Sequence, residues 1–311
     1  MTPLAAVKRE LLIRRLESWA GGALRARRAT FALGYADDPA TVQAAAAALA
    51  ELTESARGRQ LTMLTVGHAP VPPGVLRVDG ETDERLAVAL KAAGAAAAPV
   101  FGCLDAGAAA TPPALDTVAA LRAGKPAEAL VFLAPDALAA GGDRLYGDDR
   151  WRAAASLPGA HGRAALVEAY RSALDAIGFP LAAAVELVAG DEAQLAVFAT
   201  TSGKSLEAFK DALWAVDEFA GVRYRDPGDP DGHLIDISLN PHPGPLRREL
   251  VAHLEQAGER TVTQLRTFAL TDTVYRAADV TRVLSTLVTS GAVRRDPEHG
   301  RLGGDVVISV G

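Results

Sequence analysis

Cysteine is almost absent from this chain, because Cys103 is the only one among 311 residues. A single cysteine cannot build a disulfide framework, or a zinc site made of cysteines, within one chain. Cys103 lies in the apolar run APVFGCLDAG, which predicts a buried thiol on a strand. Oxidative cross-linking and cysteine-ligated metals are therefore not expected to explain the fold.

Aromatic residues, positive net charge and long apolar runs are also scarce. Aromatics make up 5% of the residues and the formal net charge is −6. Few rings are thus present for stacking on bases, and an acidic chain can bind nucleic acid only through a local basic patch. No apolar run is long enough to span a bilayer, and no signal peptide is recognisable. We therefore expect a cytoplasmic protein that does not associate with membranes.

Short apolar strands alternate with helical segments through the first part of the chain. Strands are predicted at residues 29–35, 61–66, 75–78, 99–104 and 128–133. Helices are predicted at residues 7–19, 41–56, 84–93 and 112–121. This alternation predicts a parallel, doubly wound sheet with helices on its faces.

Two further strands, at residues 181–188 and 194–200, are separated only by the turn Ala189-Gly190-Asp191-Glu192. Such a short connection predicts an antiparallel hairpin. A parallel sheet that ends in an antiparallel hairpin is the class I methyltransferase topology. We therefore predict an α/β, Rossmann-like domain with a seven-stranded sheet over residues 1–240.

The composition changes between residues 225 and 245, where RDPGDPDGH and NPHPGP are rich in proline, glycine and aspartate. We interpret this stretch as a linker with a short strand at residues 234–238. It also contains four potential metal ligands, Asp229, Asp231, His233 and His242. Their spacing matches no known metal motif, so we expect a polar turn and no metal.

The last part of the chain predicts a winged-helix domain over residues 241–311. Helices are expected at residues 246–256, after the cap Thr261, and at 277–290, and strands at 292–295 and 306–310. The turn DPEHGRLGGD between the two strands would be the wing. In winged-helix proteins the third helix enters the DNA major groove and the wing contacts the flanking backbone.

Arginines on this domain are the candidate contacts for nucleic-acid phosphates, namely Arg276, Arg282, Arg294, Arg295 and Arg301. Arg14 and Arg15, on the predicted basic face of the first helix, are secondary candidates. Interspersed acids leave the domain nearly neutral. Contact with DNA or RNA and contact with a protein partner are therefore about equally expected.

The ordered set of segments resembles the three-Cys-motif partner protein family. The matching segments are KRELLIRRLESWAG, VFGCLDAG, YGDDRW, residues 170–179, and the FATTS and FKDALWAVD runs. The resemblance covers most of the chain and implies a methyltransferase-like domain joined to a helical winged domain. The family name implies a protein partner, a three-Cys-motif protein that resembles radical-SAM enzymes.

The resemblance also implies where S-adenosylmethionine would bind, in a glycine-rich loop after the first strand and at an acid after the second. The family's loop reads approximately Asp-Gly-Phe-Ala-Gly-Pro-Gly, whereas this chain has LGYADDP from residue 33, so only Gly34 and Ala36 persist. His68 stands near the place expected for the acid, and Asp79 is a substitute candidate. Asp105 ends the fourth strand and is the candidate catalytic residue, but Ala106 replaces the family's proline.

Loss at both cofactor positions favours a non-catalytic, methyltransferase-like protein that acts with nucleic acid or a partner protein and binds no cofactor. Two alternatives stay open. One is an S-adenosylmethionine-dependent nucleic-acid methyltransferase with an atypical cofactor loop. The other is a structural subunit of a larger assembly, docked through the basic first helix and the winged domain.

Overall fold

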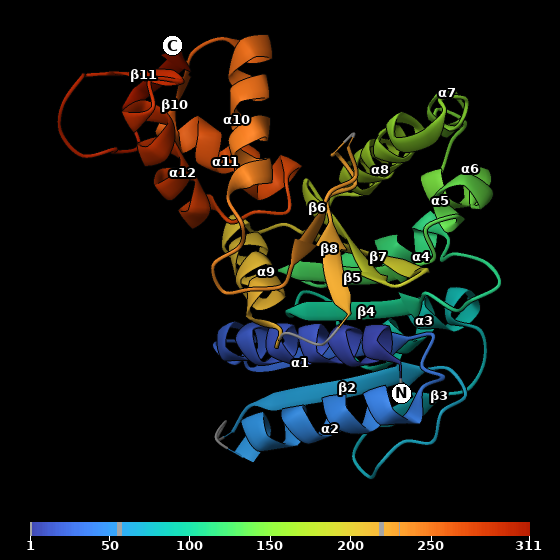
Figure 1. The fold of residues 1–311 in the computed structure, drawn as a ribbon. Helices are drawn as coiled ribbons and strands as arrows, with labels where there is room; N and C mark the ends of the chain where they lie inside the picture. The colour runs from blue at the N-terminus through green and yellow to red at the C-terminus, as the bar shows by residue number, and fades with distance from the viewer. Residues whose placement is uncertain (1, 55–57, 218–220, 230) are drawn as a thin grey trace.

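The computed structural model describes residues 2–54, 58–217, 221–229 and 231–311. A sheet of nine described strands lies at its centre, in the order β3-β2-β1-β4-β5-β7-β6-β8-β9 (Figure 1). The strands are β1 Arg28–Gly34, β2 Gln60–Val66, β3 Leu76–Val78, β4 Val100–Ala106, β5 Ala127–Leu133, β6 Leu181–Ala189, β7 Glu192–Thr200, β8 Val222–Arg225 and β9 Leu234–Asp236.

The sheet has a parallel part and an antiparallel part. Strands β3, β2, β1, β4 and β5 pair in parallel, and β7 then pairs antiparallel with both β5 and β6. Gly190 closes the β6–β7 turn with a φ of 59°, a conformation that glycine adopts without steric cost. The predicted α/β class with a mixed sheet is confirmed, and it is compatible with a Rossmann-like fold.

The predicted count of seven strands is wrong, because β8 and β9 extend the sheet beyond β6. Val222 and Tyr224 of β8 are buried while Arg223 is exposed, which is the alternation of a strand with one covered face. β8 pairs with β6, and β9 pairs with β8. Arg225 and the short strand at residues 234–236, both within the predicted linker, are therefore part of the sheet.

Helices cover both faces of the sheet, and side chains of each strand alternate between them. Phe101 and Cys103 of β4 join the apolar cluster under α1 Pro3–Ala23, α2 Pro39–Glu54 and α9 Gly203–Ala215. Val100 and Leu104 join the cluster on the opposite face. That face is covered by α3 Thr82–Ala92, α4 Leu115–Ala120, η1 Leu121–Ala123, α5 Ala137–Ala140, α6 Gly142–Tyr146, α7 Trp151–Ala155 and α8 Gly159–Ala176. The last residues of the helix predicted at 41–56 lie outside the described residues.

The C-terminal unit consists of three helices and a small antiparallel sheet with the order β10-β12-β11. Its elements are α10 Gly244–Ala257, β10 Arg260–Thr261, α11 Val262–Asp272, α12 Ala277–Thr289, β11 Val293–Asp296 and β12 Val307–Val310. Thr261 caps α11 as predicted, in a capping box with Gln264. The predicted helices and terminal hairpin are thus present, and Figure 1 shows them packed together at one end of the large sheet.

The C-terminal unit and the large sheet share one apolar core. Trp214 of α9 stacks on Tyr275 with ring centroids 5.7 Å apart and donates a hydrogen bond to the Val274 carbonyl at 3.0 Å. Asp226, which follows β8, accepts a hydrogen bond from the Val274 amide at 2.8 Å. Side chains of α10, α11 and α12 belong to the same buried cluster as those of α1 and α9.

Among the helices that are described, none has both the length and the apolar character needed to cross a bilayer.

Candidate functional site

At the carboxyl ends of β1, β2 and β4, where the resemblance implies a cofactor site, side chains of Thr82 and Leu104 pack beside Gly34. A Cβ atom on Gly34 would lie 2.6 Å from Thr82 Cγ2 and 2.7 Å from Leu104 Cδ2. The amide of Tyr35, which has a φ of 53°, donates a hydrogen bond to Thr82 Oγ1 at 2.7 Å. The first amide after β1 is therefore already used within the protein.

Asp83, at the start of α3, organises the polar contacts at this edge. It accepts hydrogen bonds from the Tyr35 hydroxyl at 3.1 Å and the Ala114 amide at 3.1 Å. It also accepts from the Thr117 hydroxyl and pairs with Arg144. Burial, and next the charge of Asp83, raise the pKa of Tyr35 above its ordinary value. These contacts tie the loop after β1 to α3, α4 and α6, and they were not predicted from the sequence.

The loops after β1 and β2 pack directly on one another. The Ala36 amide donates to the Val66 carbonyl at 3.0 Å, and the Ala69 amide donates to the Ala36 carbonyl at 2.9 Å. A Cβ atom on Gly67 would lie 2.6 Å from the Ala36 nitrogen. The backbone of Ala36 is therefore hydrogen-bonded to Val66 and Ala69, and Gly34 packs against Thr82 and Leu104.

The acidic candidates each have a basic partner. Asp105 pairs with Lys8 of α1 at 2.6 Å, and the Lys8 ammonium lies 5.2 Å from the centre of the Phe132 ring. Asp79 is exposed and pairs with Arg77. The candidate catalytic carboxylate of Asp105 is thus engaged in an ion pair within the chain.

The prediction that Arg15 belongs to an exposed basic face is wrong, because its side chain is only 2% exposed and pairs with Glu128 of β5. Burial lowers the pKa of Arg15, and the charge of Glu128 opposes that effect. Arg14 pairs with Glu10 and Asp217 at the surface. The positive charges of α1 are thus matched largely by acids of this chain.

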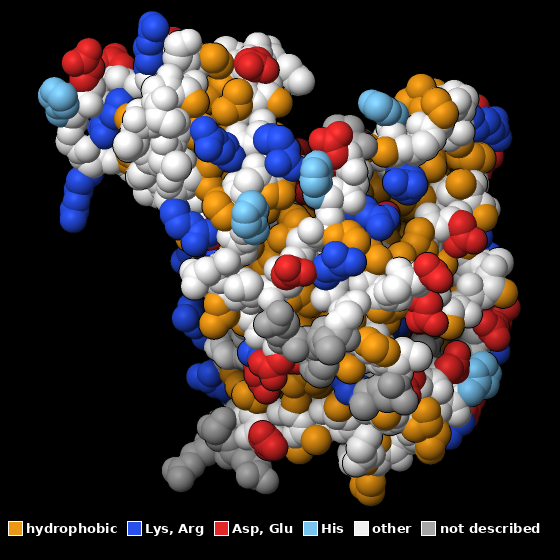
Figure 2. All heavy atoms as spheres, in the orientation of Figure 1, with side chains coloured by type: hydrophobic (Ala, Val, Ile, Leu, Met, Phe, Trp, Pro, Cys, Tyr) orange, Lys and Arg blue, Asp and Glu red, His pale blue; other side chains and the backbone are white. Residues whose placement is uncertain are grey.

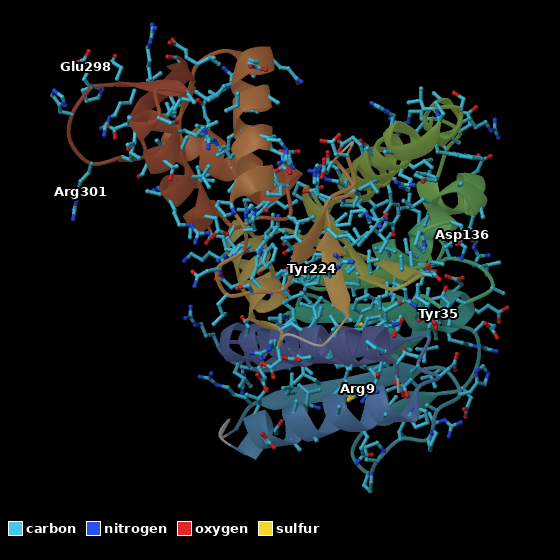
Figure 3. All side chains as sticks on the ribbon, in the orientation of Figure 1. Arg9, Tyr35, Asp136, Tyr224, Glu298 and Arg301 are labelled. Carbon is cyan, nitrogen blue, oxygen red and sulfur yellow. The ribbon has the colours of Figure 1, made fainter. Side chains whose placement is uncertain are left out.

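The C-terminal arginines fall into two groups. Arg276 pairs with Asp279 and donates to the Leu239 carbonyl, and Arg295 donates to carbonyls within the β11–β12 loop, among them Pro297 and Gly300. These two side chains shape the backbone around them. The exposed group comprises Arg282, whose side chain is 46% exposed and donates to Pro241, together with Arg294 and Arg301. Figure 3 shows Arg301 projecting from the loop, away from the body.

The outer face of α12 is rich in hydroxyl groups. Ser285, Thr286 and Thr289 are exposed there beside Arg282, and the acid of this fully described helix, Asp279, is buried. A cavity of about 470 Å³ lies between α12 and the β11–β12 loop, and its lining includes Thr281, Ser285, Thr289, Arg295 and Arg301. The three exposed arginines Arg282, Arg294 and Arg301 therefore all lie in the C-terminal unit, on α12, on β11 and in the β11–β12 loop.

The turn between β8 and β9 gathers three of the four potential metal ligands. Ligand atoms of Asp229, Asp231 and His233 lie within 4.8 Å of one another. His233 Nδ1 is 2.7 Å from Asp229 Oδ2, but the Arg248 guanidinium is 3.2 Å from the same nitrogen. In the part of the chain described, His242 is not a member of this group and instead accepts from the Gly244 amide. The Arg248 guanidinium thus places a positive charge beside this group.

The sequence matches no model of a known protein family, and a search of curated proteins found no match to it.

Proposed function

We propose that this chain is a non-catalytic, methyltransferase-like protein that binds nucleic acid through its C-terminal unit. The strand order β3-β2-β1-β4-β5-β7-β6 within the large sheet resembles that of class I methyltransferases and supports the methyltransferase-like assignment. Three helices followed by an antiparallel hairpin support a winged helix, in which α12 is the recognition helix and the β11–β12 loop is the wing.

The absence of catalysis is supported by the contacts at the carboxyl edge of the sheet. Thr82 and Leu104 occupy the space beside Gly34, and Thr82 takes the Tyr35 amide. Lys8 pairs with Asp105, the candidate catalytic acid. A cofactor would have to displace several mutually satisfied groups to bind where the resemblance implies.

The observation that carries nucleic-acid binding is the surface of α12 next to the wing. Hydroxyl groups and arginine contact phosphates and base edges, and an acid at that face would repel the backbone. On α12 the exposed charge is Arg282, because Asp279 is buried and paired. Arg294 and Arg301 add positive charge on the hairpin.

The test is fluorescence anisotropy with labelled duplex DNA and duplex RNA over a series of salt concentrations. We expect the variant carrying Arg282→Gln and Arg301→Gln to bind more weakly. Its plot of log affinity against log salt should be shallower by about 1.8, because each lost phosphate contact removes about 0.9. Arg85→Gln, on exposed α3, is the matched control and should bind as the wild type does. Wild-type protein that binds neither duplex at low salt would overturn nucleic-acid binding and favour a protein partner, such as a three-Cys-motif protein.

Titration calorimetry with S-adenosylmethionine tests the non-catalytic part separately. We expect no binding heat. Micromolar binding would overturn this part and support the alternative, an S-adenosylmethionine-dependent nucleic-acid methyltransferase. Stoichiometric co-purification in a complex, without affinity for nucleic acid or cofactor, would instead support a structural subunit.

A further inference from the structure

A second cavity lies at the opposite, amino-terminal edge of the parallel strands, between α1 and α9. Its volume is about 400 Å³. Pro99 and Pro126, the residues directly before β4 and β5, form part of its wall. Its polar lining includes Arg15, Ser18, Trp19, Arg25, Lys204 and Ser205. This cavity is separate from the carboxyl edge and from α12.

Two buried N–H donors beside this cavity lack acceptors. Trp19 is 4% exposed, and its indole Nε1 has no hydrogen-bond partner among the described residues. The same holds, within the described part of the chain, for Nε of the buried Arg15. Buried donors in native proteins nearly always have an acceptor, either from the protein, from water or from a ligand. Both residues line the cavity, and their two unpaired nitrogen atoms are buried beside it.

The cavity carries an excess of positive charge. Arg15, Arg25 and Lys204 contribute three positive side chains against one negative, Glu128, which leaves a formal charge of +2 on its described lining. The two oxygens of Glu128 are used by Arg15 and by the Ser205 hydroxyl, at 2.7 Å for the latter. Arg25 and Lys204 are exposed and have no ion-pair partner among the described residues. Figure 2 shows Lys and Arg side chains along the edge formed by α9 and the end of α1.

The amino end of α9 lies at the same cavity. α9 has 13 residues and begins at Gly203, directly before the lining residues Lys204 and Ser205. The Ser202 side chain and carbonyl take the Ser205 amide, at 3.4 Å and 3.0 Å. Gly203 and Lys204 are the first two residues of α9, where helix amides have no intrahelical acceptor and the helix dipole favours an anion.

We propose that this cavity binds a phosphate group. Its free polar groups are donors that belong to α1, to the residues after it and to α9, and they surround a space that contains no free carboxylate of the described lining. A tetrahedral phosphate accepts hydrogen bonds from several directions at once, and arginine, lysine and helix amides are its usual donors. The phosphate belongs either to a small phosphorylated molecule or to a nucleic-acid backbone that continues past α12.

The first experiment titrates the whole chain with inorganic phosphate, against potassium chloride at equal ionic strength, and follows tryptophan fluorescence and binding heat. We expect saturable binding, weakened at least tenfold by Lys204→Gln combined with Arg25→Gln. Lys91→Gln, an exposed lysine on α3, is the matched control and should bind as the wild type does. Trp19→Phe keeps a ring in the core but removes the indole donor, and it should weaken binding and abolish the fluorescence change. Because Lys204 and Arg25 are exposed, their variants test the site even if Trp19→Phe fails to fold.

The absence of saturable binding by the wild type, or equal binding by the Lys204 and Arg25 variant, would overturn the phosphate site. Competition with a short duplex DNA separates the two sources of phosphate. If the variant also loses DNA affinity, the phosphate belongs to the nucleic-acid backbone. If it binds DNA normally, the ligand is a small phosphorylated molecule. Arg282→Gln affects only DNA binding, so failure of the α12 surface and failure of this cavity give different results.

Discussion

The ammonium group of Lys210, on α9, lies 3.2 Å from the carbonyl oxygen of Tyr275. It also donates to the carbonyls of Ala269, at 3.3 Å, and Thr273, at the C-terminal end of α11. A cation is favourable at a helix C-terminus, where the last carbonyls have no intrahelical donor. Lys210 is 1% exposed, so the ammonium group of this α9 residue is buried where it caps α11 of the C-terminal unit.

Replacing this lysine should destabilise the whole chain. Lys210→Met keeps the length of the side chain but leaves buried carbonyls without a donor. We expect the free energy of unfolding in urea to fall by about 1–3 kcal/mol. Lys91→Met, at an exposed position on α3, should change it by less than about 0.5 kcal/mol. Equal midpoints and slopes for the two variants would contradict the role of Lys210 as a cap.

The packing of the C-terminal unit against the large sheet should make the free energy of unfolding depend on pH through Glu249 of α10. Burial, and next the charge of Asp226, raise the pKa of Glu249 from 4.5 to about 8. The folded chain then holds more protons than the unfolded chain between these values, so this contribution to stability is present below pH 4.5 and lost as pH rises through 8. Burial raises the pKa of Asp226 to about 6, so its contribution to stability is likewise lost as pH rises, but at lower pH.

Glu249→Gln should therefore make the fall in unfolding free energy between pH 5 and pH 8 shallower. Glu255→Gln, on the exposed side of the same helix, should leave the profile unchanged. Burial also lowers the pKa of Lys210 to about 8, which acts in the opposite direction, so stability rises as pH increases from 8 toward 10.5. Urea denaturation at a series of pH values measures these slopes, and parallel profiles for both variants would refute the assignment to Glu249.

The buried pair of Arg15 and Glu128 should behave as one unit. Arg15→Met leaves the Glu128 charge without its partner, and we expect a loss of about 3–5 kcal/mol. The variant with both Arg15→Met and Glu128→Met removes both charges and should be more stable than the sum of the single changes predicts. A double-mutant cycle by denaturation measures this coupling, and additive losses would show that the two side chains act independently.

The packing beside Gly34 predicts opposite effects for two glycine substitutions. Gly34→Ala would place a Cβ atom 2.6 Å from Thr82 Cγ2, and overpacking of this kind costs about 1–3 kcal/mol. A Cβ atom on Gly21, in α1, would meet no atom of another element within 4 Å, so Gly21→Ala should stabilise the helix by about 0.5–1 kcal/mol. Thermal unfolding distinguishes the two, and an unchanged melting temperature for Gly34→Ala would contradict tight packing between Gly34, Thr82 and Leu104.

Periodicity and turn length were enough to predict most of the large sheet. The β6–β7 hairpin followed from two apolar runs with only a short turn between them, and the alternation of strands and helices predicted the parallel part. The strands β8 and β9 were not predicted as part of the sheet. β8 has only four residues, two of them arginine, and β9 lies in a proline-rich segment, so their pairing depends on the free edge of β6.

The burial of Arg15 and Lys210 could have been read from the same periodicity. Arg15 lies four residues from Leu11 and from Trp19, on the apolar stripe of its helix. Lys210 likewise lies four residues from Leu206 and Trp214. A charge on such a stripe indicates a buried partner, but the partner itself cannot be found in one sequence, since Glu128 and the α11 carbonyls are distant along the chain. For the same reason the Tyr35–Asp83 contact was not predicted.

The C-terminal unit covers Trp214 and Lys210. A fragment that ends before α10 would therefore expose an indole ring and an ammonium group on an apolar surface. The two parts of the chain are thus not interchangeable modules. A recombination event that joined this sheet to a different C-terminal unit would also have to supply new acceptors for both side chains.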